Sequence, residues 1–160
     1  VMKFAVYDIP GHSAIDLIDR GQAIFISDSG LDADLQKIRF HVLPHRQISG
    51  VIRETKELPG LSFKGGRLIL WQGKKILHLT EAGFELPGRL MVDWLVIGND
   101  SAPDIEKFAG FVTFKKVLLD TNNSFFFASR FLEGAKLHKL EVHSVLHQGA
   151  FISKIENEDT

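Results

Sequence analysis

The feature that most constrains the fold is a nearly continuous apolar run at residues 91–97, MVDWLVI. A strand with one face in water alternates apolar and polar side chains, whereas this run contains a single charged residue, Asp93. The run therefore predicts a strand that is buried on both faces. Such a strand belongs inside a sheet that is covered on each side.

Length and composition allow a core of this kind. The chain has 160 residues, 44% of them apolar, and a globular chain of this size buries roughly 70% of the surface that its unfolded form exposes. It contains no cysteine, which excludes a disulfide scaffold and a Cys-ligated metal module. The opening Val1-Met2 runs straight into a strand-like segment, which suggests a fragment of a longer protein.

The charge balance excludes a global attraction to polyanions. Nineteen basic side chains stand against 20 acidic ones, for a formal charge of −1, so any site for nucleic acid or a membrane surface has to be a local patch. The sequence lacks the run of roughly 18 apolar residues that a membrane helix needs, and its start does not resemble a signal peptide.

The remaining elements follow from periodicity and turn residues, in the order βββα, then ββ, then βαβαββ. Strands are expected at 3–8, 14–18, 23–26, 51–55, 68–71, 76–79 and 117–119. Helices are expected at 32–38, 103–109 and 124–137, the last with Asn123 as its N-cap. Residues 141–146 and 150–155 are expected to close as a hairpin, whereas residues 40–63 give the weakest signal.

Two histidine pairs raise the question of a metal site. His41 and His45 would share a face of a helix, but Pro44 between them argues against that helix. His143 and His147 share a face of the strand expected at 141–146 and its extension, and a solvated outer face explains them more simply than a metal does.

Standard catalytic motifs are missing from the sequence, including the nucleophile elbow, the Walker A loop, the dinucleotide fingerprint and His-Glu-x-x-His. Asp16 and Asp19 fall on opposite faces of a short strand and are expected to be edge or turn residues. The run Phe125–Phe127 could stack against bases. At the start of an amphipathic helix, core packing with one partly exposed ring is the more typical use.

Positive charge is locally in excess at residues 35–56, where Glu54 is the single acid. The basic side chains there are Lys37, Arg39, Arg46, Arg53 and Lys56. We interpret them as a candidate DNA-binding patch, with a solvated surface as the alternative.

Residues 7–16, YDIPGHSAID, and 24–30, IFISDSG, resemble the opening of one kind of metallo-β-lactamase-like domain. That domain is appended to ComEC, the DNA-internalisation channel of natural competence. In this family the first strand ends in Asp-Val-Gly-Gln-Gly-Asp-Ala and the third in Ile-Asp-Gly-Gly. The matching residues here are Asp8, Ala14, Asp28 and Gly30.

The resemblance continues through the second half of the chain, in the same order and with similar spacing. The segments that resemble family strands are 66–79, 92–97, 117–123 and 148–152. With PGHSAID near its start and HQGAF near its end, the whole sequence is similar to the C-terminal portion of ComEC-like proteins from Bacteroidetes.

The metal ligands of that family are not present. Its fold binds one or two metals through a His-x-His-x-Asp-His loop after the first helix, and no such motif follows residues 32–38. Thr80-Glu81 stands where the family has Gly-Asp, and residues 98–101, GNDS, stand where it has His-His-Gly-Ser. Too few oxygen ligands are visible to predict another cation site.

The resemblance implies an α+β fold, a shortened metallo-β-lactamase-like αββα sandwich over residues 1–160, with two β-sheets face to face and helices outside. It also implies a soluble domain of an inner-membrane protein, on the extracytoplasmic side. The implied partners are the membrane channel portion of the same polypeptide and single-stranded DNA, with no small-molecule cofactor.

The function implied is that of a non-catalytic domain in DNA uptake, which docks to the channel or guides the DNA. A metal-dependent phosphodiesterase or nuclease with altered ligands, and a purely structural cap of the channel assembly, are the alternatives. We predict neither catalytic residues nor metal ligands. The residues expected to line a vestigial cleft are Asp8, His12, Asp28, Glu81, Asn99, Asp100, Asn123 and His147.

Overall fold

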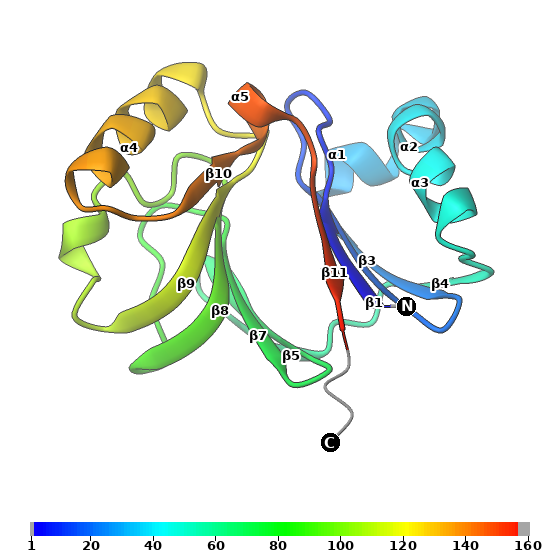
Figure 1. Ribbon diagram of the computed structural model, residues 1–160, viewed down its shortest axis with the longest axis horizontal. Helices are drawn as coiled ribbons and strands as arrows, with labels where there is room; N and C mark the ends of the chain where they lie inside the picture. The colour runs from blue at the N-terminus through cyan, green and yellow to red at the C-terminus, as the bar shows by residue number, and fades with distance from the viewer. Residues whose placement is uncertain (1, 157–160) are drawn as a thin grey trace. The chain divides into compact units, whose positions relative to one another are not determined.

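The computed structural model describes residues 2–156, apart from the side chain of Lys107. The chain divides into two compact units, one formed by residues 1–58 and 149–160 and the other by residues 59–148. Within the described residues each unit has its own mixed β-sheet together with short helices (Figure 1). This composition confirms the expected α+β class.

The sheet of the first unit has the strand order β11-β1-β2-β3-β4. Its strands are β1 (Met2–Val6), β2 (Ala14–Asp19), β3 (Gln22–Ser27), β4 (Arg53–Thr55) and β11 (Phe151–Ile155). Neighbours are antiparallel except β3 and β4. The predicted β1-β2-β3 meander is confirmed, and Arg20 and Gly21 make its second turn with φ of 51° and 77°.

Short helices lie beside this sheet, namely α1 (Ser29–Asp32), α2 (Leu35–His41) and α3 (Leu43–Ile48) (Figure 1). The helix predicted at 32–38 is wrong in extent, because Asp28 caps α1 and Asp34 caps α2. Pro44 lies in the first turn of α3, where no backbone N–H is needed. The weak stretch 40–63 therefore begins with a helix, and His41 and His45 lie on different helices.

The helices pack on one face of the sheet through a compact apolar cluster. Its members are Ala5, Tyr7, Ile9, Ala14, Phe25, Leu31, Ile38 and Val42. Since side chains alternate along each strand, the members from β1, β2 and β3 share one face. This face also carries Asp16, whose Cα lies opposite those of Ala5 and Phe25.

The sheet of the second unit has the strand order β10-β9-β8-β7-β6-β5. Its strands are β5 (Gly60–Phe63), β6 (Gly66–Trp71), β7 (Lys74–Leu79), β8 (Leu90–Ile97), β9 (Val112–Leu119) and β10 (Val142–Ser144). Strands β7 to β10 are parallel, and the predicted β6-β7 hairpin is confirmed. Strand β8 is buried on both faces only towards its end, since Met91 is 73% exposed.

Helical segments of this unit are η1 (Ile105–Lys107), α4 (Phe125–Leu137) and α5 (Val145–Gln148). Helix α4 confirms the prediction for 124–137, but its N-cap is Ser124, whose side chain accepts from the Phe127 N–H. The helix predicted at 103–109 is reduced to a single 3₁₀ turn. Phe127, Ala128 and Phe131 pack from α4 into the apolar cluster over β7, β8 and β9.

The predicted C-terminal hairpin is wrong. β10 pairs in parallel with β9, whereas β11 pairs antiparallel with β1 in the other unit's sheet. The helical turn α5 and Gly149, with φ of 83°, separate the two strands and prevent them from pairing as neighbours. His143 therefore lies on β10 and His147 on α5, so they do not share a strand face. Among the described residues no helix is long and apolar enough to span a membrane.

Candidate functional site

In sheets with parallel strands, binding sites commonly form at the carboxyl ends of the strands, because the loops that follow them lie at one edge of the sheet. Strands β7, β8, β9 and β10 end at Leu79, Ile97, Leu119 and Ser144. Polar residues follow β8 and β9 directly. We call these the strand-end cluster: Asn99, Asp100, Asp120, Asn122 and Asn123.

Asn123 ties together the loops that follow β8 and β9. Its buried amide donates to the carbonyl oxygens of Ile97 and Asp120 at 2.7 and 2.9 Å. Its oxygen accepts from the Asp100 N–H at 2.8 Å. Both ends of the amide are therefore bonded to backbone, which satisfies polar groups that would be costly to bury alone.

Asp100 and Asn122 complete the link between the same loops. An Asp100 carboxylate oxygen accepts from the Ser124 N–H at 2.8 Å, and the Asn122 oxygen accepts from the Asn99 N–H at 3.1 Å. Asn99 and Asp100 have φ of 55° and 53°, a left-handed conformation that Asn and Asp tolerate better than most residues. The side chains of Asp100 and Asn122 are thus bonded to the backbone.

Asp120 of the strand-end cluster is buried next to His78 of β7. Nε2 of His78 lies 3.9 Å from a carboxylate oxygen of Asp120, and the other Asp120 oxygen accepts from the Thr121 N–H at 2.9 Å. Burial, with a smaller contribution from Arg67, lowers the pKa of His78 to about 3. The imidazole is therefore neutral at physiological pH, so its contact with Asp120 is not a salt bridge.

Exposed rings lie at the start of α4. Phe125 and Phe126 are 65% and 70% exposed, so the expectation of one partly exposed ring is wrong. The physical reason is the helical period, which turns Phe127, Ala128 and Phe131 inward and leaves the preceding two residues outside.

These rings are held by specific partners. The Phe125 ring stacks on His147, with centroids 4.5 Å apart and an interplanar angle of 22°. The nitrogens of His147 in turn bond to the hydroxyls of Ser144 and Ser129, at 2.8 and 3.2 Å. The Arg130 guanidinium lies 5.6 Å from the Phe126 ring centroid. We call Phe125, Phe126, Arg130 and His147 the ring platform.

A pocket of about 550 Å³ adjoins the platform. Phe126 and Arg130 form part of its wall, and Phe127, Phe131 and Ala135 line it from α4. Its opposite wall comes from residues 103–106, and a contact of 2.8 Å between Nε2 of His138 and a Glu106 carboxylate oxygen joins the two walls. This volume lies in the range of small-ligand sites.

In the first unit the structure brings together His12 and Asp28, two residues of the predicted cleft. Nδ1 of His12 lies 2.9 Å from Oδ1 of Asp28, which also accepts from the Leu31 N–H at 2.9 Å, and Oδ2 accepts from the Ser13 N–H at 2.7 Å. Burial raises the pKa of Asp28, but these bonds outweigh it and lower the pKa below its ordinary value. Asp28 is thereby a helix cap, and Asp8 is exposed.

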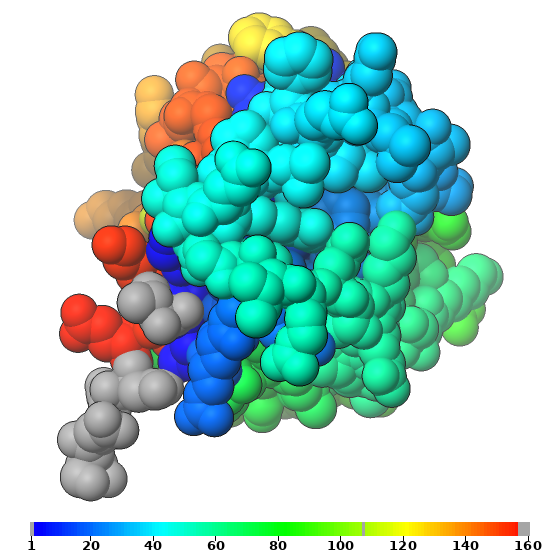
Figure 2. All heavy atoms as spheres, turned by 90° about the vertical axis from the view of Figure 1, so that its right-hand side faces the viewer, coloured from blue at the N-terminus to red at the C-terminus, as the bar shows by residue number. Residues whose placement is uncertain are grey.

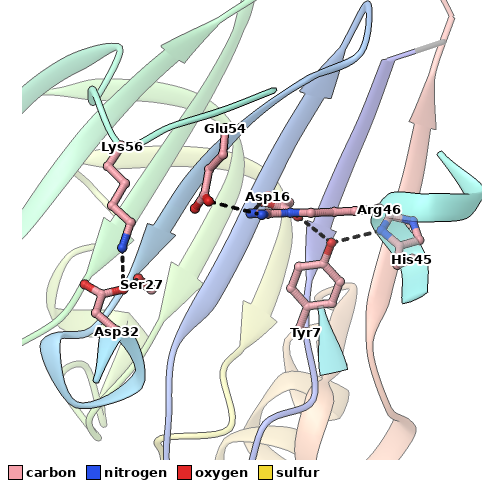
Figure 3. Close-up of polar contacts among 8 residues, drawn as sticks. All are labelled: Tyr7, Asp16, Ser27, Asp32, His45, Arg46, Glu54 and Lys56. Carbon is pink, nitrogen blue, oxygen red and sulfur yellow. Dashed lines mark hydrogen bonds and ion pairs between the residues drawn. The ribbon is translucent and has the colours of Figure 1, made fainter. Parts of the chain in front are cut away.

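Arg46, a residue of the predicted DNA-binding patch, lies inside the protein (Figure 3). Its guanidinium donates twice to Asp16 at 2.8 Å, lies 3.5 Å from Glu54 and sits over the Phe25 ring. Asp16 is fully buried, so its expected place at an edge or turn is wrong. Arg46 was expected to be a surface cation, but it is buried because it neutralises Asp16. Without this partner the buried carboxylate of Asp16 would be costly.

The other basic residues lie at or near the surface. Lys56 pairs with Asp32 at 2.8 Å (Figure 3), whereas Arg39 and Arg53 are exposed and Lys37 is half-buried. Arg46 is therefore not available at the surface, and a DNA-binding role for the others stays a prediction.

A model of the family described as ComEC C-terminal domain matches residues 4–155. The chain belongs to this family. No curated protein and no solved structure matches the chain. The resemblance to ComEC is thus confirmed at the level of the family.

In this ComEC C-terminal domain the residues predicted to line one cleft lie on both units. Asp8, His12 and Asp28 belong to the first unit, whereas Glu81, Asn99, Asp100, Asn123 and His147 belong to the second. Glu81 is exposed after β7, and its backbone N–H bonds to Gly65. Among the residues that the structure describes, no group of three or more His, Asp or Glu side chains is placed to hold a metal ion.

Sequence reasoning missed the Asp16–Arg46 pair and the exposure of the ring platform. The first had a signal, because Asp16 interrupts an otherwise apolar strand, AIDLI, and a charge at such a position needs a buried partner. For the second, the run Phe125–Phe127 was itself the signal, because a base-stacking surface was one interpretation of it, but core packing with one partly exposed ring was preferred.

Proposed function

We propose that this ComEC C-terminal domain is a non-catalytic part of a competence protein and guides single-stranded DNA during uptake. Membership of the ComEC family supports a role in DNA uptake. The observation that carries the proposal is the ring platform, an exposed and ordered aromatic surface at the start of α4.

The strand-end cluster supports a role without catalysis. A hydrolytic centre needs side chains that converge on one reacting atom or metal. Here Asp100, Asn122 and Asn123 instead bond to backbone groups of the adjoining loops. Their chemistry is used to hold the loops in place.

The platform suits a single strand because every base has an aromatic face that can stack on another ring. Phe125 and Phe126 offer such rings, and Arg130 offers a guanidinium for a phosphate. The adjoining acids Asp104 and Glu106 disfavour a polyphosphate track along the pocket. Binding at the platform is therefore dominated by stacking and depends little on salt.

The finer parts of the proposal rest on the resemblance. We place the domain on the extracytoplasmic side of the inner membrane, next to the channel portion of the same polypeptide, and assign it a shortened, degenerate metallo-β-lactamase-like fold. The face-to-face arrangement of sheets in that fold stays a prediction.

The test is a fluorescence anisotropy titration with two probes of equal length, a single-stranded oligothymidine and an oligomer of abasic nucleotides. We expect the 160-residue chain to bind the first more tightly. Phe125→Ala with Phe126→Ala should weaken oligothymidine binding about tenfold or more, since stacking contributes ~1–3 kcal/mol per base. The logarithm of the affinity should fall with that of the salt concentration with a slope of about −1.

Phe111→Ala is the matched control, because Phe111 is also exposed, at 54%, and lies under an arginine, Arg89. This variant should bind like the unaltered chain. No binding of oligothymidine at low salt would contradict the proposal and favour a structural cap. Elemental analysis of protein purified without chelator or metal-affinity tag covers the remaining alternative, since a retained equivalent of zinc or manganese would support a phosphodiesterase.

A further inference from the structure

Residues 35–53 are unusual in charge and in apolar content. This stretch of the first unit has no Asp or Glu, and it carries Lys37, Arg39, Arg46 and Arg53. It forms α2, α3 and the segment that leads into β4. With Arg46 buried against Asp16, the charges at its surface come from Lys37, Arg39 and Arg53.

The acids next to this stretch are already bonded. Asp34 caps α2, accepting from the Lys37 N–H, and Asp32 pairs with Lys56. Glu54 lies 3.5 Å from Arg46. Asp34 and Glu54 keep their negative charge, because a cap does not neutralise a carboxylate and Arg46 is already paired with Asp16, but within residues 35–53 Lys37, Arg39 and Arg53 face no acid of the same stretch.

Large apolar side chains are also exposed along this stretch. They are Leu35 at 70%, Phe40 at 78%, Leu43 at 37%, Ile48 at 84% and Ile52 at 82% exposure. We call this surface, with Lys37, Arg39 and Arg53, the α2–α3 face. Figure 2 looks onto it, and the cyan atoms of the helices form much of the near surface.

The outward orientation follows from the helical period. Ile38 and Arg46 point towards the sheet, since the first packs on the apolar cluster and the second bonds to Asp16. Phe40 and Ile48 each lie two residues further along, a rotation of about 200°, and therefore point away from the sheet.

Buried contacts hold α3 in this orientation (Figure 3). Besides the Arg46–Asp16 pair, Nδ1 of His45 lies 2.9 Å from the Tyr7 hydroxyl, and that hydroxyl donates to Asp16 at 2.6 Å. Turning Ile48 inward would break this network. The exposure of the apolar side chains is thus built into the fold.

We propose that the α2–α3 face docks on the surface of an anionic lipid bilayer. The phosphates of DNA would bind the cations but would not interact favourably with Phe40, Ile48 or Ile52. The headgroup region of a bilayer accepts apolar side chains into its acyl boundary and attracts Lys and Arg through its negative surface potential. A bilayer surface therefore uses both features of the face. This inference goes beyond the proposed role in guiding DNA and does not depend on it.

The test is co-sedimentation of the 160-residue chain with vesicles. One set is pure phosphatidylcholine, and the other is an equimolar mixture of phosphatidylcholine and phosphatidylglycerol. We expect binding to the mixed vesicles and little binding to the neutral ones. Phe40→Ser with Ile48→Ser should lower the partition coefficient about tenfold or more, because two buried apolar side chains are lost. Arg39→Gln with Arg53→Gln should reduce the preference for anionic vesicles.

Met91→Ser with Leu137→Ser is the matched control, since these side chains of the second unit are 73% and 84% exposed. It should partition like the unaltered chain. Absence of binding to mixed vesicles, or an equal loss in the control, would overturn the proposal. Loss of self-association in the Phe40 and Ile48 variant, seen by analytical ultracentrifugation without a change in vesicle binding, would make the face an interface between copies. Loss of oligothymidine binding alone in the arginine variant would make it a DNA surface.

Discussion

Asp16 and Arg46 form the central polar contact of the first unit. Two parallel hydrogen bonds of 2.8 Å join them in the interior, and the Tyr7 hydroxyl donates to the same carboxylate. Burial raises the pKa of Tyr7 above its ordinary value, and the charge of Asp16 raises it further. Tyr7 therefore stays a neutral donor, and the network connects β1, β2 and α3.

Removing either Asp16 or Arg46 alone should lower the free energy of unfolding more than replacing both with apolar residues. Asp16→Ala leaves the Arg46 guanidinium buried without its main counter-charge, which should lower the free energy of unfolding by about 3–5 kcal/mol. The measurement is equilibrium unfolding in urea. Asp16→Leu combined with Arg46→Met should recover most of the loss, and a double variant as unstable as the single one would contradict the electrostatic explanation.

His78 should make stability depend on pH. Its pKa is about 3 when folded and 6.5 in the ordinary case, so between these values the unfolded state binds more protons and stability falls as pH falls. The slope should approach about 1.4 kcal/mol per pH unit. Burial also lowers the pKa of His45, with a contribution from Lys3, which acts in the same direction.

Urea unfolding at intervals between about pH 5 and 6.5 isolates this effect, because carboxylates with lowered pKa, such as Asp28, titrate below that window. His78→Gln should flatten the dependence and leave the smaller part due to His45. An unchanged slope in this variant would show that His78 is not the responsible group.

At the scale of elements, the loops after β8 and β9 depend on Asn123. Asn123→Ala would remove the side-chain bonds to the carbonyl oxygens of Ile97 and Asp120, each of which keeps one backbone donor, and would leave the Asp100 N–H without its acceptor. The loss of three bonds should lower the free energy of unfolding by about 2–4 kcal/mol. Asn122→Ala, which removes one bond from a half-buried residue, is the control and should cost about 1 kcal/mol or less. Equal losses would mean that the two side chains hold the loops alike.

Helices and strands were predictable from the sequence where an apolar pattern extended over several turns or where characteristic turn residues marked a hairpin. Helix α4 repeats its apolar residues over several turns, and the β6-β7 hairpin is marked by Gln72-Gly73, both with positive φ. The short helices α1, α2 and α3 were not, because each is no longer than two turns and depends on a cap or a proline position. Strand β10 was assigned the wrong partner, since its neighbour β9 is distant in sequence.

At the scale of the whole molecule, two surfaces on different units carry the proposals. The ring platform belongs to the second unit and is suited to stacking, whereas the α2–α3 face belongs to the first and combines cations with apolar side chains. The net charge of the chain, which is almost neutral, indicates neither surface, because each is a local arrangement of side chains.

The sequence by itself determined the α+β class, the meander, the β6-β7 hairpin, α4 and the ComEC family. These depend on composition, short-range periodicity and motif order, all of which are local properties of the chain. Only the tertiary structure decided which polar and aromatic residues are available for binding. Burial is set by contacts between residues far apart in sequence, which is why Arg46 is buried against Asp16 while Phe126 and Ile48 remain exposed.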